Sequence, residues 1–140
     1  MTVQASSHDA AGEQSLMETR MNEDIARINV GHRLSDVAIF NRVAYLAGQV
    51  PEKTVGLGIV EQTREVLEII EKLLEQAGSH KSRILACQIF LKDIGNIGAM
   101  NRVWDAWIPR GHTPPRATVQ ALMADAGWEI EVVVAGALLE

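Results

Sequence analysis

Residues 59–77 repeat apolar side chains at the spacing of one face of an α-helix, and this pattern constrains the fold more than any other segment. Charged side chains fill the opposite face, where Glu68 and Lys72 stand at the four-residue spacing that favours an ion pair. Gly78 is suited to end the helix in the left-handed conformation. The helix therefore has one face to bury against another layer of structure. The predicted apolar stripe consists of Ile59, Val60, Thr63, Val66, Leu67, Ile70, Leu73, Leu74 and Ala77.

Short strand-like segments flank this helix on both sides, and Asn41-Arg42 suits a tight hairpin turn between two of them. The order β-β-β-α-β-α-β-β predicts an α+β fold, with a mixed, mostly antiparallel sheet and both helices packed on one face. Because a chain of 140 residues has no elements left for the other face, we expect self-association. The predicted strands are residues 24–29, 36–41, 42–50, 84–91, 114–123 and 128–139, and the second helix is residues 95–107.

The first 21 residues differ in texture from the rest, because they are polar and small and show no sustained period. We interpret residues 1–21 as a mobile tail and residues 22–140 as a single domain.

Composition narrows the class of protein. A net charge of −5 argues against a nucleic-acid partner, because phosphate binding needs a basic face. No apolar run is long enough to cross a bilayer, and no signal peptide is visible, so no membrane partner is expected. The single cysteine cannot form an internal disulfide, which favours the reducing cytoplasm.

Common catalytic and metal-binding motifs are absent from the sequence. There is no CxxC, HExxH, P-loop, GxSxG or Rossmann glycine pattern, and the four histidines lack metal-ligand spacing. A zinc or serine hydrolase is therefore not expected, and neither a metal nor an organic cofactor is predicted. Cys87 lies inside an apolar run, so we interpret it as a small buried hydrophobe rather than a nucleophile.

Arg116 directly follows two prolines near the start of the predicted strand 114–123, and Glu129 and Glu131 lie near the start of the last predicted strand. One interpretation is that Arg116 pairs with one of these glutamates at a solvated edge, which contributes little to stability. The other is that the guanidinium binds the carboxylate of a substrate, while a glutamate handles a proton or a water. The residues alone leave these two interpretations open.

A simple hairpin between the last two strands, turning near residues 123–127, predicts their register. Arg116 then lies near Val134, and Glu129 lies near Ala121, about 16 Å apart along the ladder at the usual strand rise. The same register puts the two side chains on opposite faces. We therefore expect that a site using both residues takes them from neighbouring subunits.

The segments "PPRATVQ" and "WEIEVVVAG" resemble the C-terminal signature of the YjgF/RidA family, formerly called endoribonuclease L-PSP. The upstream segments "YLAGQVP", "EQTREVLEIIEKLLEQAGSHKSRILACQIFLKD" and "MNRVWDAW" extend the resemblance from about residue 35 to the C-terminus. The series "NRVWDAW", "GH.P" and "RATVQALM" is most similar to the YoaB-like branch.

The resemblance implies a chorismate-mutase-like α+β fold, a homotrimer with clefts between subunits, and hydrolysis of reactive 2-imino or 2-enamino acids to 2-oxo acids and ammonia. By position, Arg116 matches the carboxylate-binding arginine and Glu129 the glutamate that handles water. Gly48 offers a backbone amide, Thr118 matches a pocket position where the family often has cysteine, and Asn101 matches the helix asparagine.

The sequence departs from the family pattern at two pocket positions. Leu34 stands where the deaminases usually carry tyrosine, and Ala47 stands where they carry serine. The more apolar pocket favours an alternative function, in which the chain binds a 2-oxo acid or a related metabolite without turnover and acts as a regulatory protein. An endoribonuclease is not expected, because the chain is acidic and lacks a basic or aromatic strip.

Overall fold

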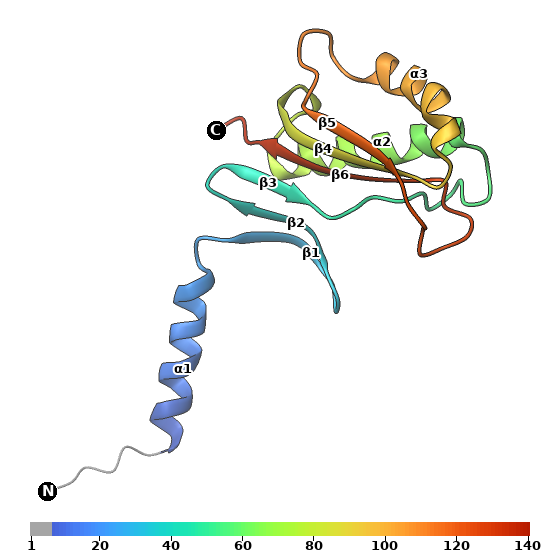
Figure 1. Cartoon of the computed structure of the whole chain (residues 1–140). Helices are drawn as coiled ribbons and strands as arrows, with labels where there is room; N and C mark the ends of the chain where they lie inside the picture. The colour runs from blue at the N-terminus through green and yellow to red at the C-terminus, as the bar shows by residue number, and fades with distance from the viewer. Residues whose placement is uncertain (1–6) are drawn as a thin grey trace, which may run out of the picture.

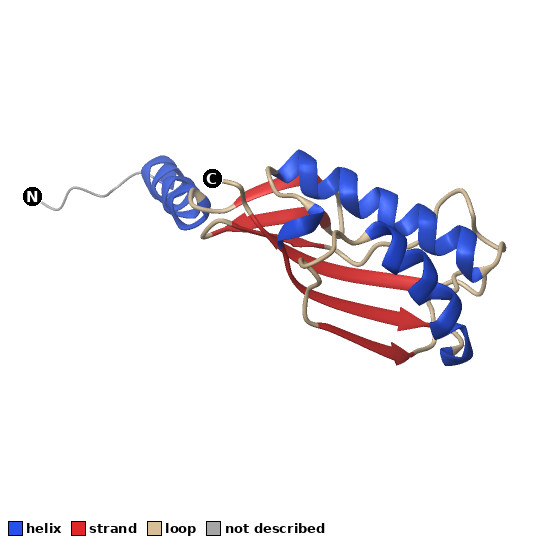
Figure 2. Ribbon diagram, turned by 90° about the horizontal axis from the view of Figure 1, so that it is seen from above, coloured by secondary structure: helices blue, strands red, loops and turns tan. Residues whose placement is uncertain are grey.

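The computed structural model describes residues 7–140, apart from the side chains of residues 7–9 and 19. A sheet with two helices on one face forms the body of the molecule (Figure 1, Figure 2). The strands are β1 (Ala26–Val30), β2 (Ser35–Phe40), β3 (Val43–Leu46), β4 (Ile84–Leu91), β5 (Arg116–Gln120) and β6 (Ile130–Ala137). The helices are α1 (Ser7–Asn22), α2 (Ile59–Ala77) and α3 (Ile97–Trp107), with short 3₁₀ turns at Lys81–Arg83 and Ile94–Asn96.

The strands lie in the order β1-β2-β3-β6-β4-β5. Every neighbouring pair is antiparallel except β4 and β5, which are parallel. The predicted α+β class and mixed sheet are therefore confirmed, and so is the element order from β1 onward. Asn41 and Arg42 have φ of 49° and 65°, the left-handed pair that a two-residue turn between β2 and β3 requires.

Helix α2 packs its apolar stripe against the sheet, and α3 packs beside it on the same face (Figure 2). Gly78 ends α2 at φ 88°, and the N–H of Ser79 donates to the carbonyl of Leu74, as in a Schellman cap. The predicted pair of Lys72 and Glu68 is present at 3.0 Å. One position differs from the predicted stripe, because the fully buried side chain in the first turn is the polar Gln62.

The opposite face of the sheet is open within the described part of the chain. Tyr45 and Val119 are 52% and 44% exposed there. A hollow of about 490 Å³ lies across this face, and its walls include Tyr45, Gln88, Ala117, Val133 and Ala135. The predicted lack of a covering layer is thus what the fold presents.

Helix α1 is a feature that the sequence did not predict. It projects away from the sheet beyond β1 (Figure 1), and Leu16, Met17 and Met21 are each more than 60% exposed. The helix carries no coherent apolar stripe that would dock it on the domain. The mobility of residues 1–21 stays a prediction, and residues 1–6 lie outside the described part of the chain. No helix among the described residues is long and apolar enough to cross a membrane.

The close approach of α2 to β6 depends on Gly136. A Cβ built there would lie 2.8 Å from both Leu74 Cδ2 and Ser79 Oγ. We expect Gly136→Ala to lower the free energy of unfolding by about 1–3 kcal/mol, because the added methyl overpacks the core. Gly98→Ala in α3 is the matched control, since a Cβ there meets nothing within 4 Å. Urea unfolding of both variants measures the difference, and equal stability of the two would contradict this account of the packing.

Candidate functional site

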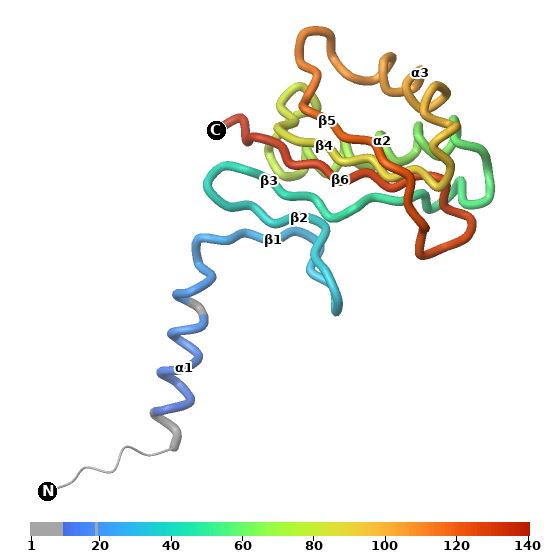
Figure 3. Tube along the Cα trace, in the orientation of Figure 1, coloured from blue at the N-terminus to red at the C-terminus, as the bar shows by residue number. Residues whose placement is uncertain are grey.

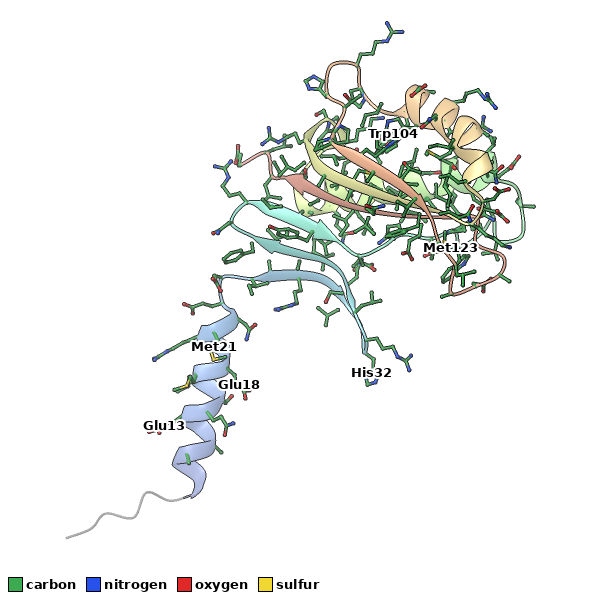
Figure 4. All side chains as sticks on the ribbon, viewed as in Figure 1. Glu13, Glu18, Met21, His32, Trp104 and Met123 are labelled. Atoms are coloured by element: carbon green, nitrogen blue, oxygen red, sulfur yellow. The ribbon has the colours of Figure 1, made fainter. Side chains whose placement is uncertain are left out.

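Arg116 opens the edge strand β5, where it lies level with Cys87 of β4. Its side chain turns toward α3, and Nη2 donates a 2.8 Å hydrogen bond to Asn101 Oδ1. The guanidinium also lies over the ring of Trp104, 5.0 Å from the centroid. Figure 4 labels Trp104, which lies between α3 and the sheet. The amide and the ring therefore fix the orientation of the charge.

A hollow of about 280 Å³ opens beside this guanidinium, lined by Arg116, Asn101, Trp104, Asp105, Thr113 and Pro114. The ion pairs found among the described residues do not include Arg116. The interpretation of Arg116 as the partner of a glutamate is thus not what the structure shows. A half-buried guanidinium without a carboxylate partner, beside an open hollow, is suited to bind an anionic ligand.

Thr118 lies two residues along β5 and so shares the face of Arg116. Its Oγ1 is buried and has no hydrogen-bond partner in the described structure. Sequence reasoning included Thr118 and Asn101 in the site but singled out neither Trp104 nor Asp105. The spacing of Asn101 and Trp104, three residues apart on one helix, was the available signal.

A second group of candidate residues lies where β3 ends beside β6. A Cβ on Gly48 would come within 3.0 Å of Glu131 Cδ, so Gly48 allows this carboxylate to lie against the backbone. Glu129 precedes β6, and its Oε1 is 3.9 Å from Lys92 Nζ. The structure therefore places Gly48 next to Glu131. The sequence analysis had instead assigned the site glutamate to Glu129.

The predicted hairpin between the last two strands is wrong, because β4 lies between β5 and β6. Cys87 of β4 pairs with Arg116 on one side and with Val134 on the other. At the far end of β4, the N–H of Lys92 donates to the carbonyl of Glu129. Arg116 and Glu129 are thus about five residues apart along β4, still on the order of 16 Å.

Leu34 is also remote from Arg116 within one chain. It is 60% exposed and lies in the turn between β1 and β2, where Figure 4 labels the neighbouring His32. Strands β3, β6 and β4 separate β2 from β5. The chain therefore brings together Arg116, Asn101 and Trp104, but it does not bring Leu34, Gly48 or Glu129 to them.

Cys87 lines the open-face hollow yet is 5% exposed. Burial raises the pKa of its thiol to about 12, and the nearby charge of Arg116 opposes this shift only in part. The expected burial of Cys87 is therefore confirmed, while its low reactivity stays a prediction. Among the residues that the structure describes, no three His, Cys, Asp or Glu side chains are grouped so that they could hold a metal ion.

Comparison with known proteins assigns the family. The family model described as endoribonuclease L-PSP matches residues 24–137. A RutC family protein of Haemophilus influenzae is 49% identical over 110 residues, which cover 79% of this chain and 95% of that protein. The RutC family protein YoaB of Escherichia coli is 42% identical over 114 residues, covering 81% and 98% of the two chains.

Solved structures agree with this assignment. A YjgF-family protein of Neisseria meningitidis superposes with a TM-score of 0.81 at 36% identity, covering 84% of this chain and 97% of that one. A more distant relative, 24% identical over 103 residues (70% of this chain and 74% of that protein), is the rat protein named 2-iminobutanoate/2-iminopropanoate deaminase. The chain belongs to the YjgF/RidA family, also named endoribonuclease L-PSP.

The raised pKa of Cys87 predicts slow reaction with thiol reagents in the folded protein. At pH 8, a thiol with a pKa of about 12 is ionised in only about one molecule in ten thousand. Labelling with a chromogenic disulfide should therefore be at least about 100-fold slower in the native protein than in urea, where the ordinary pKa returns. The chain has one cysteine, so the signal has one source. Equal rates in both states would mean that Cys87 is accessible.

Proposed function

We propose that this protein hydrolyses reactive 2-imino or 2-enamino acids to 2-oxo acids and ammonia. The observation that carries the proposal is the guanidinium of Arg116, held by Asn101 and Trp104 beside a hollow and paired with no described carboxylate. A bidentate bond to a substrate carboxylate would supply the missing counter-charge. The deaminase name of the rat relative supports the same chemistry.

The proposed reaction needs little beyond placement and a base. Water adds to the carbon of the C=N bond while Glu129 accepts a proton from that water. Glu129 returns this proton to nitrogen, which gives a carbinolamine; an enamine substrate first tautomerises to the imine. The hydroxyl proton then passes to nitrogen as the C–N bond breaks, so that ammonia leaves and the carbonyl of the 2-oxo acid forms. Arg116 holds the carboxylate, and the backbone amide of Gly48 and the unpartnered hydroxyl of Thr118 offer further polar contacts.

We further propose that the site is completed across the interfaces of a homotrimer. Two features support this: the sheet has one open face, and Arg116 and Glu129 lie too far apart in one chain for a small ligand to touch both. Arg116 contributes to the walls of both the open-face hollow and the hollow beside α3. A neighbouring subunit on the open face would therefore reach the edge of β5 that carries Arg116, and it would bring its own Glu129, Gly48 and Leu34.

Binding without turnover is the second candidate function, and the apolar Leu34 and Ala47 favour it. Such a protein would bind a 2-oxo acid through Arg116 and report its level. Ammonia release from a freshly generated 2-imino acid, measured above the spontaneous rate, separates the two functions. Saturable binding of a 2-oxo acid without faster release would replace the deaminase with a sensor.

Replacement of Arg116 tests the carboxylate contact. We expect Arg116→Lys to lose about as much kcat/KM as Arg116→Ala, about 10- to 100-fold, because an ammonium cannot form the paired hydrogen bonds. Arg110→Lys, at an exposed position in the loop between α3 and β5, is the control and should keep wild-type activity. Circular dichroism checks the folding of each variant. Full activity in Arg116→Lys would reduce the residue to a general positive charge.

Mixed assemblies test whether the site is shared between chains. Arg116→Ala and Glu129→Gln chains, each with strongly reduced activity, are dissociated, mixed in equal amounts and reassembled, and sedimentation verifies the trimers. If each site takes Arg116 from one subunit and Glu129 from its neighbour, about a quarter of the sites in random trimers carry both native residues. About a quarter of wild-type activity should then return. No recovery in verified mixed trimers would place both residues in one chain or remove one of them from the site.

A further inference from the structure

Gln62 is a fully buried amide in the first turn of α2, and all three of its resolved hydrogen bonds go to backbone groups. Its Nε2 donates to the carbonyl of Leu57 at 3.0 Å and to the carbonyl of Gly127 at 2.8 Å. Its Oε1 accepts from the N–H of Glu129 at 2.7 Å. Both N–H donors of the amide are thus used. The side chain links α2 to the loop that precedes this helix and to the loop that precedes β6.

Two loops meet at this amide. Residues 51–58 and residues 121–129 form two loops that come together near the start of α2 (Figure 3), where the N–H of Gly56 donates to the carbonyl of Gly127 at 3.1 Å. A Cβ on Gly127 would lie 2.6 Å from Val55 Cγ1 and 3.3 Å from the backbone nitrogen of Gly56, so the two loops pack closely at this point. Gln62 therefore sits under a close contact between the loops rather than in a loose surface turn.

Glu65 secures the first of these loops from the next turn of α2. Its carboxylate accepts hydrogen bonds from the backbone N–H groups of Glu52, Lys53 and Thr54 and from the hydroxyl of Thr54. Desolvation tends to raise the pKa of this carboxyl, but the hydrogen bonds, led by that of the Thr54 hydroxyl, bring the pKa below its ordinary value. The loop is therefore tied to α2 by an ionised group, which gives Gln62 a fixed frame.

The backbone of Glu129 is held at both of its polar groups. Gln62 Oε1 accepts from its N–H, and its carbonyl accepts from the N–H of Lys92 at 3.0 Å. Lys92 Nζ also donates to the carbonyl of Ala126 at 2.7 Å. The backbone position from which the Glu129 side chain extends is therefore fixed by Gln62 on one side and by the end of β4 on the other.

We propose that Gln62 is a positioning residue for Glu129, acting through the backbone of residues 127–129 without touching the substrate. This inference rests on the proposed deaminase function. An apolar side chain at position 62 would leave the N–H of Glu129 and the carbonyl of Leu57 without their partner at partly buried positions. The loop would then move to reach water, and the carboxylate would move with it.

Gln62→Met tests the proposal, because methionine keeps the length of the side chain but makes none of the three hydrogen bonds. We expect kcat to fall about 10- to 100-fold, as for a misplaced catalytic group, while KM stays within about twofold because Arg116 is untouched. Thr63→Val is the matched control. Thr63 is the next residue and only 1% exposed, and its hydroxyl has no hydrogen-bond partner in the described structure, so this variant should keep wild-type kinetics.

A double variant decides whether Gln62 acts through Glu129. If it does, Gln62→Met should slow a Glu129→Gln enzyme by no more than about twofold, because the group that it positions is already lost. Independent, multiplied losses would overturn the proposal. A wild-type kcat in folded Gln62→Met would overturn it as well.

Amide hydrogen exchange gives a readout that does not depend on activity. The Glu129 N–H should exchange at least about tenfold faster in Gln62→Met than in Thr63→Val, and unchanged protection would overturn the positioning role. If the wild-type protein releases no ammonia, the proposed function fails, and this measurement still decides whether Gln62 fixes the backbone of Glu129.

If Gln62→Met does not fold, Gln62→Glu replaces it. Its neutral carboxyl can accept from Glu129 and donate to one carbonyl, so both kcat and protection should fall as the pH rises and this carboxyl ionises. Losses that are independent of pH would then count against the proposal.

Discussion

The packing of α2 across the sheet is the contact on which the rest of the structure depends. Its apolar side buries Val66, Ile70 and Leu74 against the helix-facing side chains of the sheet. The start of the same helix turns polar groups, Gln62 and Glu65, toward the two loops that precede α2 and β6. One helix therefore supplies both the core and the frame of the Glu129 loop. A shift of α2 would alter stability and the candidate site together.

Local periodicity explains why much of the fold was predictable. The stripe of α2, the Asn41-Arg42 turn and the alternation of β6 are each visible within a few residues of sequence. The hairpin of β5 and β6 was wrong because strand neighbours are a long-range choice. Strands β4 and β6 bury alternate side chains under the helices, which favours central positions with a neighbouring strand on each side. Strand β5 carries Arg116, Thr118 and Gln120 on that face and lies at the edge of the sheet. Helix α1 was missed because it has no apolar stripe, the signal by which α2 was found.

The candidate site was predictable only where a residue is unusual for its surroundings. Arg116 stood out because its guanidinium stands near the start of a predicted strand of the sheet, and in the structure Asn101 and Trp104 hold that guanidinium in place. Gln62 gave no such signal, since its partners Gly127 and Glu129 are 65 and 67 residues away in the sequence. A buried amide within a helical stripe resembles an ordinary imperfection of the pattern. Its importance becomes visible only when the backbone groups that it joins are known.

The edge position of Arg116 reconciles a charged residue with a packed strand. A fully buried guanidinium would need a carboxylate partner to offset desolvation, and such a partner would block a ligand. Here Trp104 covers one face of the guanidinium and Asn101 accepts from Nη2, so the charge is oriented by neutral groups. Because these contacts are neutral, they do not neutralise the positive charge of Arg116, and the open hollow leaves part of the guanidinium accessible to solvent. Under the proposed function, the carboxylate of the substrate would supply the counter-charge that these neutral contacts leave out.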